Sequence, residues 1–206
     1  MQKLIECVPN FSEGRDPDII RQITAAIESV EGISLLDVDP GASTNRTVVT
    51  FVGSPDAAVE AAFRGIQKAA ELIDMRKHKG AHPRMGATDV CPFIPVSNVS
   101  WEEAIACANK LGKRVGDELK IPVYLYEMAS KNSSRSNLAV IRAGEYEGFS
   151  EKIKEAVWKP DFGPAVFNEK SGATAIGARE FLVAYNVNLN TKAARRANSV
   201  AFDVRE

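Results

Sequence analysis

Several features that mark special classes of protein are missing from this chain of 206 residues. It has only three cysteines, Cys7, Cys91 and Cys107, and none has the CxxC spacing of a zinc site or belongs to a disulfide framework. No apolar run approaches the roughly 20 residues that cross a bilayer. The first residues also lack the apolar segment and cleavage site of a signal peptide. We therefore expect no membrane contact and a cytoplasmic location.

An excess of charge of one sign is missing as well. The 26 Lys and Arg residues face 27 Asp and Glu residues, which gives a formal net charge of −1. Such a balance provides no general field for attracting a polyanion, so nucleic acid is not expected as a partner. Hydrophobic residues make up 45% and charged residues 26% of the chain. Both values are typical of a soluble globular protein and exclude the disordered class.

What is present is an alternation of strand and helix signals. Aliphatic and β-branched runs bounded by turn formers predict strands. Helices are predicted where a Ser or Asp cap precedes a proline and apolar residues then repeat at spacings of three and four. The run at 91–96 contains two prolines, so we expect it to be short or at an edge of the sheet. Up to residue 96 the expected elements are a strand at 2–8, a loop at 9–14, a helix from Asp16 to Gly32, buried strands at 33–38 and 46–52, a helix from Ser54 to about Asp74, and the strand at 91–96.

This order of elements is the ferredoxin-like split βαβ order, and it predicts an α/β (α+β) protein. A capping box at Ser100 and Glu103 predicts a third helix, and the run at 121–128 predicts a further strand. We therefore expect the split βαβ order to be extended to a mixed sheet flanked by helices.

The signals weaken after residue 130. Residues 138–158 are only patchily helical, and the glycine-rich stretch at 159–180 is typical of a turn-rich linker between domains. The alternating residues at 181–189 predict a strand, and those after them predict a helix.

Both histidines of the chain, His78 and His82, lie in one polar loop at 75–90. Three interpretations are open: a zinc pair, two exposed loop residues without a role, or acid–base chemistry. Gly80 and Pro83 oppose the regular helix that an HxxxH zinc pair needs. His82 is the better base, because a glycine-rich loop can bring its imidazole close to a ligand. His78 sits between two lysines, which suits the rim of an anion site better than proton transfer.

A second polar cluster follows the strand at 33–38. Asp37 and Asp39 alternate along the chain and should share a face. Either carboxylate could serve a cationic ligand group or a base, or could act only as a cap. Arg46 could bind a substrate carboxylate with its two-pronged guanidinium. A third polar patch, around Asn10, follows the first strand, and the three loops could meet at one rim of the sheet.

Four segments of the chain together resemble the glutamate formimidoyltransferase family. They are CVPNFSEGR at 7–15, LLDVDPGASTNRTVVTFVG at 35–53, HKGAHPRMGATDVCPFIP at 78–95, and KPDFGPA with SGATAIGAR within 159–179. The resemblance implies a mixed sheet flanked by helices, followed by a smaller C-terminal subdomain, with the substrates in a groove between the two. It also implies transfer of a formimino group from N-formimino-L-glutamate to N5 of tetrahydrofolate, in histidine degradation. Tetrahydrofolate is then the co-substrate, and no metal is needed.

The resemblance also implies roles for individual residues. His82, in the HKGAHPRMGATD motif, corresponds to the catalytic histidine, and Asp39, in the DVDPG motif, corresponds to its acidic partner. The loop from Gly163 to Gly172 corresponds to the folate-contacting segment. The expected substrate-binding residues are Asn10, Asn45, Arg46, Lys79, Arg84, Gly163, Pro164 and Gly172.

Other activities and the organisation of the chain remain open. The same pteridine pocket would serve formyl transfer or cyclisation of 5-formyltetrahydrofolate, and a non-catalytic folate-binding protein could keep the fold. The resemblance places an N-terminal subdomain at 1–178 and the beginning of a C-terminal subdomain at 179–206. An alternating strand with no sheet to join presents an exposed edge, so we expect the tail to pair with a second copy as a homodimer or to be mobile. We also expect slow turnover by this chain alone, unless a separate polypeptide completes the groove.

Overall fold

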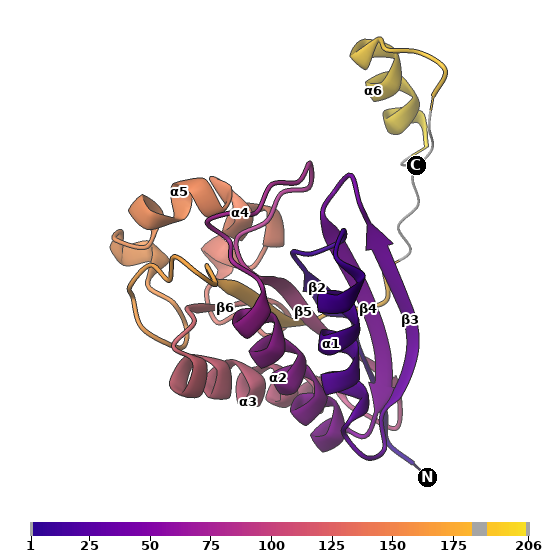
Figure 1. Cartoon of the computed structure of the whole chain (residues 1–206), viewed down its shortest axis with the longest axis vertical. Coiled ribbons are helices and arrows are strands. Elements are labelled where there is room, and N and C mark those ends of the chain that lie inside the picture. Colours follow the sequence, from indigo (N-terminus) through magenta and orange to yellow (C-terminus); the bar gives the residue numbers. More distant parts are fainter. Residues whose placement is uncertain (1, 183–188, 205–206) are drawn as a thin grey trace.

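The computed structural model describes residues 2–182 and 189–204, and it places seven strands in one mixed sheet (Figure 1). The strands are β1 (Leu4–Cys7), β2 (Asn10–Phe11), β3 (Ser34–Gly41), β4 (Arg46–Gly53), β5 (Thr88–Ser97), β6 (Val123–Glu127) and β7 (Thr174–Ala178). The helices are α1 (Pro17–Glu28), α2 (Pro55–Leu72), α3 (Trp101–Leu119), α4 (Leu138–Arg142), α5 (Glu145–Lys152) and α6 (Ala194–Asp203), with 3₁₀ turns at Ser133–Arg135 and Ala156–Trp158.

The first half of the chain has the ferredoxin-like strand order. β1 and β2 follow one another along the same line and pair antiparallel with both β4 and β5, while β3 pairs with the outer side of β4. β7 then joins β5 in parallel, and β6 joins β7 in parallel. The sheet therefore runs β3, β4, β1 with β2, β5, β7, β6. This confirms the expected split βαβ order and its extension to a mixed sheet.

One face of the sheet is covered by α1, α2 and α3, and we call it the helix-covered face (Figure 1). Ile27 of α1, Ile66 of α2 and Leu111 of α3 are almost completely buried there, together with Phe51 and Phe93 of the sheet. The predicted caps are confirmed: the carboxylate of Asp16 accepts hydrogen bonds at the start of α1, and Ser100 and Glu103 form a capping box at the start of α3. This face carries the main apolar core.

The opposite face is divided into two halves. Over β5, β7 and β6, the helices α4 and α5 bury a second apolar cluster around Tyr124, Tyr126 and Phe149. Over β3, β4 and β1, residues such as Asp37, Asp39 and Val48 remain exposed or half-buried. We call this second half the open face.

Two strands differ from the sequence prediction because their neighbours, rather than their own propensity, determine their position. β5 is ten residues long and central, not short or at an edge. Its prolines are tolerated because they lie where the neighbouring strand is irregular: Pro92 at the break between β1 and β2, and Pro95 at a register shift in β1. β3 is largely exposed rather than buried, because it is the outermost strand and one face is open.

The stretch at 159–180 is not a linker, because β7 lies within it and pairs on both sides, with β5 and β6. Its sequence, TAIGA, lacks the bulky alternation that marks a strand. Small residues are required: a Cβ at Gly177 would lie 2.6 Å from the ring of Tyr126. Likewise, the loop predicted at 9–14 contains the short strand β2, which is held on both sides by β4 and β5.

The remaining expectations fall into three groups. The patchy helical signal at 138–158 corresponds to α4, α5 and a 3₁₀ turn, and the helix predicted near the end is α6. The strand expected at 181–189 lies mostly outside the described residues. Within the described residues, no helix is long and apolar enough to cross a membrane.

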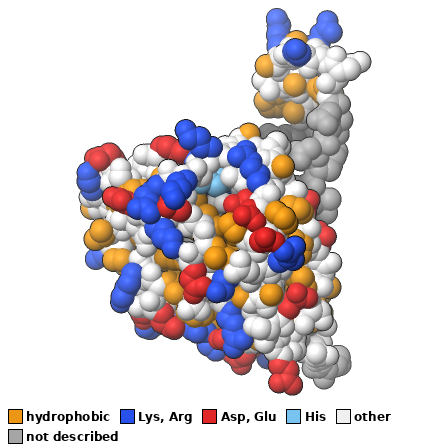
Figure 2. Space-filling model, viewed as in Figure 1, with side chains coloured by type: hydrophobic (Ala, Val, Ile, Leu, Met, Phe, Trp, Pro, Cys, Tyr) orange, Lys and Arg blue, Asp and Glu red, His pale blue; other side chains and the backbone are white. Residues whose placement is uncertain are grey.

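Figure 2 shows Lys and Arg side chains interspersed with Asp and Glu, as the near-neutral net charge suggests.

Candidate active site

A cavity of about 580 Å³ lies on the open face, within the size range of small-molecule sites. Asn10 of β2, Asp39 of β3, Arg46 of β4 and His82 from the loop at 75–87 line it. Four of the residues expected to act on substrates therefore meet in one place. Glu6 of β1 and Arg179, which follows β7, also line this cavity, which we call the His82 cavity.

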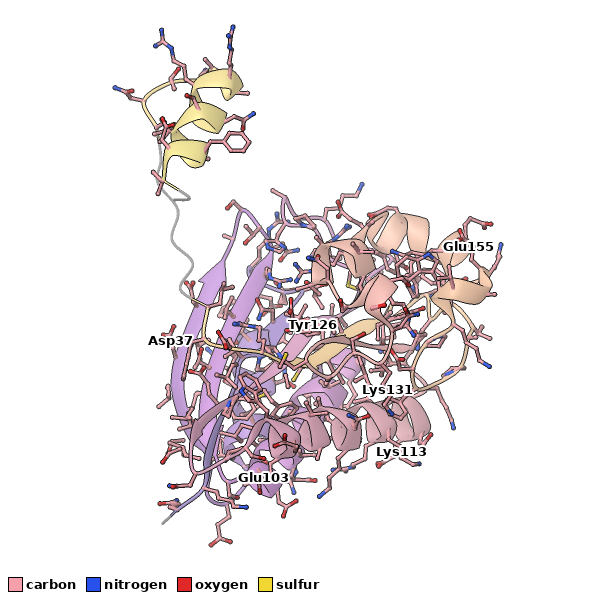
Figure 3. All side chains as sticks on the ribbon, turned by 180° about the vertical axis from the view of Figure 1, so that it is seen from behind. Asp37, Glu103, Lys113, Tyr126, Lys131 and Glu155 are labelled. Atoms are coloured by element: carbon pink, nitrogen blue, oxygen red, sulfur yellow. The ribbon has the colours of Figure 1, made fainter. Side chains whose placement is uncertain are left out.

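A β-bulge in β3 directs the acidic residues toward the cavity. Leu35 pairs with Phe51, whose side chain is in the main core, while Asp37 pairs with Thr50 on the other face. Simple alternation would place Leu35 and Asp37 on the same face, but the extra residue, Leu36, reverses the faces after it. Asp37 and Asp39 therefore share the open face, as predicted, and both line the cavity. Figure 3 labels Asp37 on β3, at one end of the strand order, and Tyr126 on β6, at the other.

The loop that carries His82 is attached to the turn between β3 and β4. The Ala81 amide donates to the carbonyl of Ser43 at 3.3 Å, and the Asn45 side-chain amide donates to the carbonyl of Lys79 at 3.1 Å. The backbones approach so closely that a Cβ at Gly80 would lie 2.1 Å from the carbonyl oxygen of Thr44. Only glycine fits there, and the close approach fixes the loop above the sheet.

The hydrogen bonds of His82 leave one of its ring nitrogens available. Nδ1 lies 2.6 Å from the carbonyl oxygen of Pro83, which can only accept, so Nδ1 carries the proton. In the neutral ring, Nε2 then has a free lone pair. Burial lowers the pKa of His82 below its usual value, and the positive charge of Arg46 lowers it further. The imidazole is therefore neutral at physiological pH and suited to accept a proton.

Both ring nitrogens of His78, in contrast, are engaged by the protein. Nδ1 accepts a hydrogen bond from Arg84 Nε at 3.2 Å, so Nε2 donates to the carbonyl of Asn45 at 2.9 Å. Burial lowers the pKa of His78 as well, which stabilises the neutral ring in this arrangement. His78 thus links two loops, and neither nitrogen is available to a substrate.

Asp89, which the sequence analysis did not select, is the completely buried carboxylate behind the cavity. It forms ion pairs with Arg46 and with Arg142, whose Nη2 lies 2.6 Å away, and it accepts a hydrogen bond from the Met85 amide at 3.1 Å. Arg46 also donates from Nε to Asn10 Oδ1 at 3.1 Å. The sequence signal for Asp89 was weak, a single acidic residue near the start of an apolar strand.

Arg84 and Lys79, expected to bind substrate carboxylates, lie beside another cavity of about 530 Å³. Arg84 is buried, and its guanidinium is already paired with carboxylates of α5, at 2.6 Å to Glu147 and 2.8 Å to Glu145. These pairs raise its pKa. The charge of Arg84 is therefore balanced within the protein.

The other expected binding residues also lie outside the lining of the His82 cavity. Asn45 is buried, and its side chain accepts from the Gly14 amide at 3.0 Å besides donating to Lys79. Gly172 packs against Met85, and Gly163, which precedes Pro164, packs against α3 at Gly116. The structure does not bring these residues together with His82, and their binding roles remain predictions.

Asp39 and His82 share the cavity, but no hydrogen bond or ion pair joins them among the described residues. The charged groups that act on the His82 imidazole are Arg46, Arg142 and Asp89. The geometry therefore favours Asp39 as a group that contacts a ligand rather than one that orients the imidazole. Within residues 2–182 and 189–204, no cluster of three or more His, Cys, Asp and Glu residues could hold a metal.

Comparison with known proteins gives a consistent result. Residues 4–179 match the model of the formiminotransferase domain, N-terminal subdomain. A formimidoyltransferase-cyclodeaminase of Dictyostelium discoideum is 58% identical over 100% of this chain and 38% of its own length. Glutamate formimidoyltransferases of Thermoplasma acidophilum and Streptococcus pyogenes are 53% and 44% identical, over 98% and 100% of this chain.

The chain is shorter than these relatives. It spans about two fifths of the length of the cyclodeaminase relative, and 67% and 69% of the two glutamate formimidoyltransferases.

Proposed function

The chain belongs to the formiminotransferase family, whose N-terminal subdomain it contains, and on that premise we propose that the His82 cavity transfers a formimino group from N-formimino-L-glutamate to N5 of tetrahydrofolate. The observation that carries this proposal is the free Nε2 of a neutral imidazole in one cavity with the exposed carboxylate of Asp39. The proposed reaction moves a proton from one nitrogen to another, which the imidazole can carry. It also develops positive charge on the amidine, which the carboxylate can stabilise.

His82 acts on protons in both halves of the proposed reaction. The N5 amine of tetrahydrofolate attacks the amidine carbon, and a new N5–C bond forms while N5 passes its proton to Nε2 of His82. The C–N bond to glutamate then breaks, and the same proton moves from His82 to the departing nitrogen. The products are 5-formiminotetrahydrofolate and glutamate, and the imidazole returns to its neutral form. Such acid–base assistance is worth roughly 10² to 10⁴ in rate.

Asp39 stabilises positive charge on the transferred group. An amidine is more electrophilic when protonated, and the tetrahedral intermediate formed from it is also cationic. A carboxylate in the same cavity favours both species by electrostatic attraction. Because Asp39 is exposed on an edge strand rather than buried in a network of the protein, its charge is available to the substrate.

Arg46 and Asn10 form a fixed wall of the site. Their hydrogen bond, together with the ion pair of Arg46 with Asp89, holds the Asn10 side chain in place. Lys79 and the loop with Gly163, Pro164 and Gly172 remain the proposed contacts for the folate.

The organisation of the whole protein is part of the proposal. We propose that residues 1–178 form the N-terminal subdomain and that residues 179–206 belong to the following subdomain, since the family match covers 4–179. A homodimer and a cytoplasmic location complete the proposal, and gel filtration with light scattering would test the first.

The test is turnover by the full chain with N-formimino-L-glutamate and tetrahydrofolate, measured as release of glutamate. Parallel assays replace the donor with N-formyl-L-glutamate or supply 5-formyltetrahydrofolate alone. Formimino transfer faster than both alternatives supports the proposal. Preference for either formyl substrate, or folate binding without any turnover, contradicts it.

A further inference from the structure

Arg179 is a basic side chain in the lining of the His82 cavity, and among the described residues it has no carboxylate close to its guanidinium. Only two Lys or Arg residues, Arg46 and Arg179, line this cavity among the described residues. Arg46 is paired with Asp89, whereas no carboxylate of the described chain lies within 4 Å of the Arg179 guanidinium. Its Nη1 donates to the carbonyl of Glu180 at 2.8 Å.

The backbone of Arg179 is firmly placed. Its amide donates to the carbonyl of Phe93 in β5 at 3.1 Å, directly after the buried strand β7. The side chain is half-buried at the cavity wall. Burial raises the pKa of Tyr126 and of Glu6, and the nearby positive charge of Arg179 opposes that rise. An arginine anchored in this way loses little conformational entropy when it binds a ligand.

The aspartates of the cavity and Arg179 come from different parts of the sheet. Asp37 and Asp39 lie on β3, and Arg179 follows β7, four strand positions away in the sheet. At about 4.8 Å between neighbouring strands, the backbones of β3 and β7 are roughly 19 Å apart, and the side chains from both line the same cavity. A substrate with a cationic group near one end and a carboxylate near the other is complementary to this arrangement.

We propose that Arg179 binds a substrate carboxylate in the His82 cavity, in place of Arg84, whose charge α5 already balances. The proposal rests on the proposed function, because it takes this cavity as the substrate site. A carboxylate is present both on the formimino donor and on the glutamate tail of the folate. The chemistry is the same for both, and the experiment separates them.

The experiment measures equilibrium binding to the full chain rather than turnover. One probe is N-formyl-L-glutamate, which has both donor carboxylates but no amidinium group. The others are tetrahydrofolate and tetrahydropteroate, which lacks the glutamate tail. The variants are Arg179→Gln, Arg179→Lys and Glu6→Gln, and Arg21→Gln on α1 is the control for loss of one surface charge.

Arg179→Gln should weaken binding of one carboxylate probe by about tenfold or more, with unchanged thermal stability, and Arg179→Lys should weaken it less. Loss confined to N-formyl-L-glutamate assigns Arg179 to the donor. Loss for tetrahydrofolate but not for tetrahydropteroate assigns it to the folate tail. Glu6→Gln should strengthen the affected binding, because it removes an anion that competes for Arg179.

Unchanged binding of all probes by Arg179→Gln overturns the proposal. Equal weakening by Glu6→Gln also overturns it, because Glu6 and Arg179 would then both support the structure of the cavity rather than act on the ligand. The two failures are distinguishable. If the wild-type chain binds the probes through Arg179 but transfers no formimino group, only the proposed function fails. If it transfers the group and Arg179→Gln binds normally, only the role of Arg179 fails.

Discussion

The two faces of the sheet use the same strands for opposite purposes. On the helix-covered face, Val49 and Phe51 of β4 are completely buried under α1 and α2. On the open face, Arg46 and Val48 of the same strand line a cavity with His82 and Asp39. One face gains stability from burial of apolar surface, and the other keeps charged groups accessible to a ligand. Changes on the two faces should therefore affect different measurements.

The largest expected effect is on the open face. His82→Gln should reduce formimino transfer by about 10² to 10⁴-fold, because it removes the group that carries the proton in the proposed reaction. The melting temperature should stay nearly unchanged, since the side chain is half-buried and its one hydrogen bond is local. His78→Gln is the matched control, and its effect on turnover should be much smaller. A larger loss of turnover in the His78 variant would reverse the roles assigned to the two histidines.

Asp89→Asn tests how much the buried ion pairs behind the open face contribute to the stability of the protein. The substitution leaves Arg46 and Arg142 without their buried counter-charge, so unfolding in urea should reveal a loss of about 3–5 kcal/mol. Asp117→Asn, at an exposed ion pair on α3, is the control and should change stability by less than about 0.5 kcal/mol. Equal stability of the two variants would show that Asp89 is not needed to hold the arginines.

Two neighbouring valines compare the faces directly. Val49→Ala, on the helix-covered face, should lower the free energy of unfolding by about 2 kcal/mol, because it creates a cavity in the main core. Val48→Ala, on the open face, should lower it by less than about 1 kcal/mol, because Val48 is only half-buried. Urea titration of both variants measures the difference. A larger loss for Val48 would mean that the open face is covered in solution.

Asp39→Asn tests the aspartates of the cavity. It keeps the shape of the side chain and removes the charge, so turnover should fall by about tenfold while substrate affinity changes less. Asp37→Asn, two residues away on the same face, is the matched control and should affect turnover less. If Asp39→Asn instead lowers the melting temperature at normal turnover, the carboxylate has only a structural role.

The smallest expected effect concerns the pH dependence of turnover. Burial lowers the pKa of His82, and the charges of Arg46 and Arg142 lower it further. Turnover needs the neutral ring, so it should be lost as the pH falls through this lowered pKa. Arg142→Gln removes one positive charge, which raises the pKa and should move the acidic limb of the profile to higher pH. An unchanged profile in this variant, with Arg21→Gln as reference, would show that Arg142 does not act on His82.

Local sequence signals predicted the elements that depend on local interactions. The caps at Asp16 and Ser100 and the apolar repeats fixed the beginnings of α1 and α3, because capping and helix periodicity are short-range effects. At β5 the signals predicted a strand but not its length or its interior position, and at β7 they missed the strand, because both strands are stabilised by their neighbours. β7 consists of small residues because the ring of Tyr126 lies against it, and that contact has no signature in the sequence of β7 itself.

The site shows the same division. By itself, the sequence determined which residue types are candidates for the chemistry: two histidines in one loop, alternating aspartates after a strand, and the motifs of a known family. Only the tertiary structure decided which of them are available. Hydrogen bonds engage both nitrogens of His78 and leave Nε2 of His82 free, and α5 balances Arg84 while Arg179 has no carboxylate at close range among the described residues. The residue type determines which chemistry a side chain can perform. Whether its lone pair or charge is available to a ligand depends on partners that are distant in the sequence.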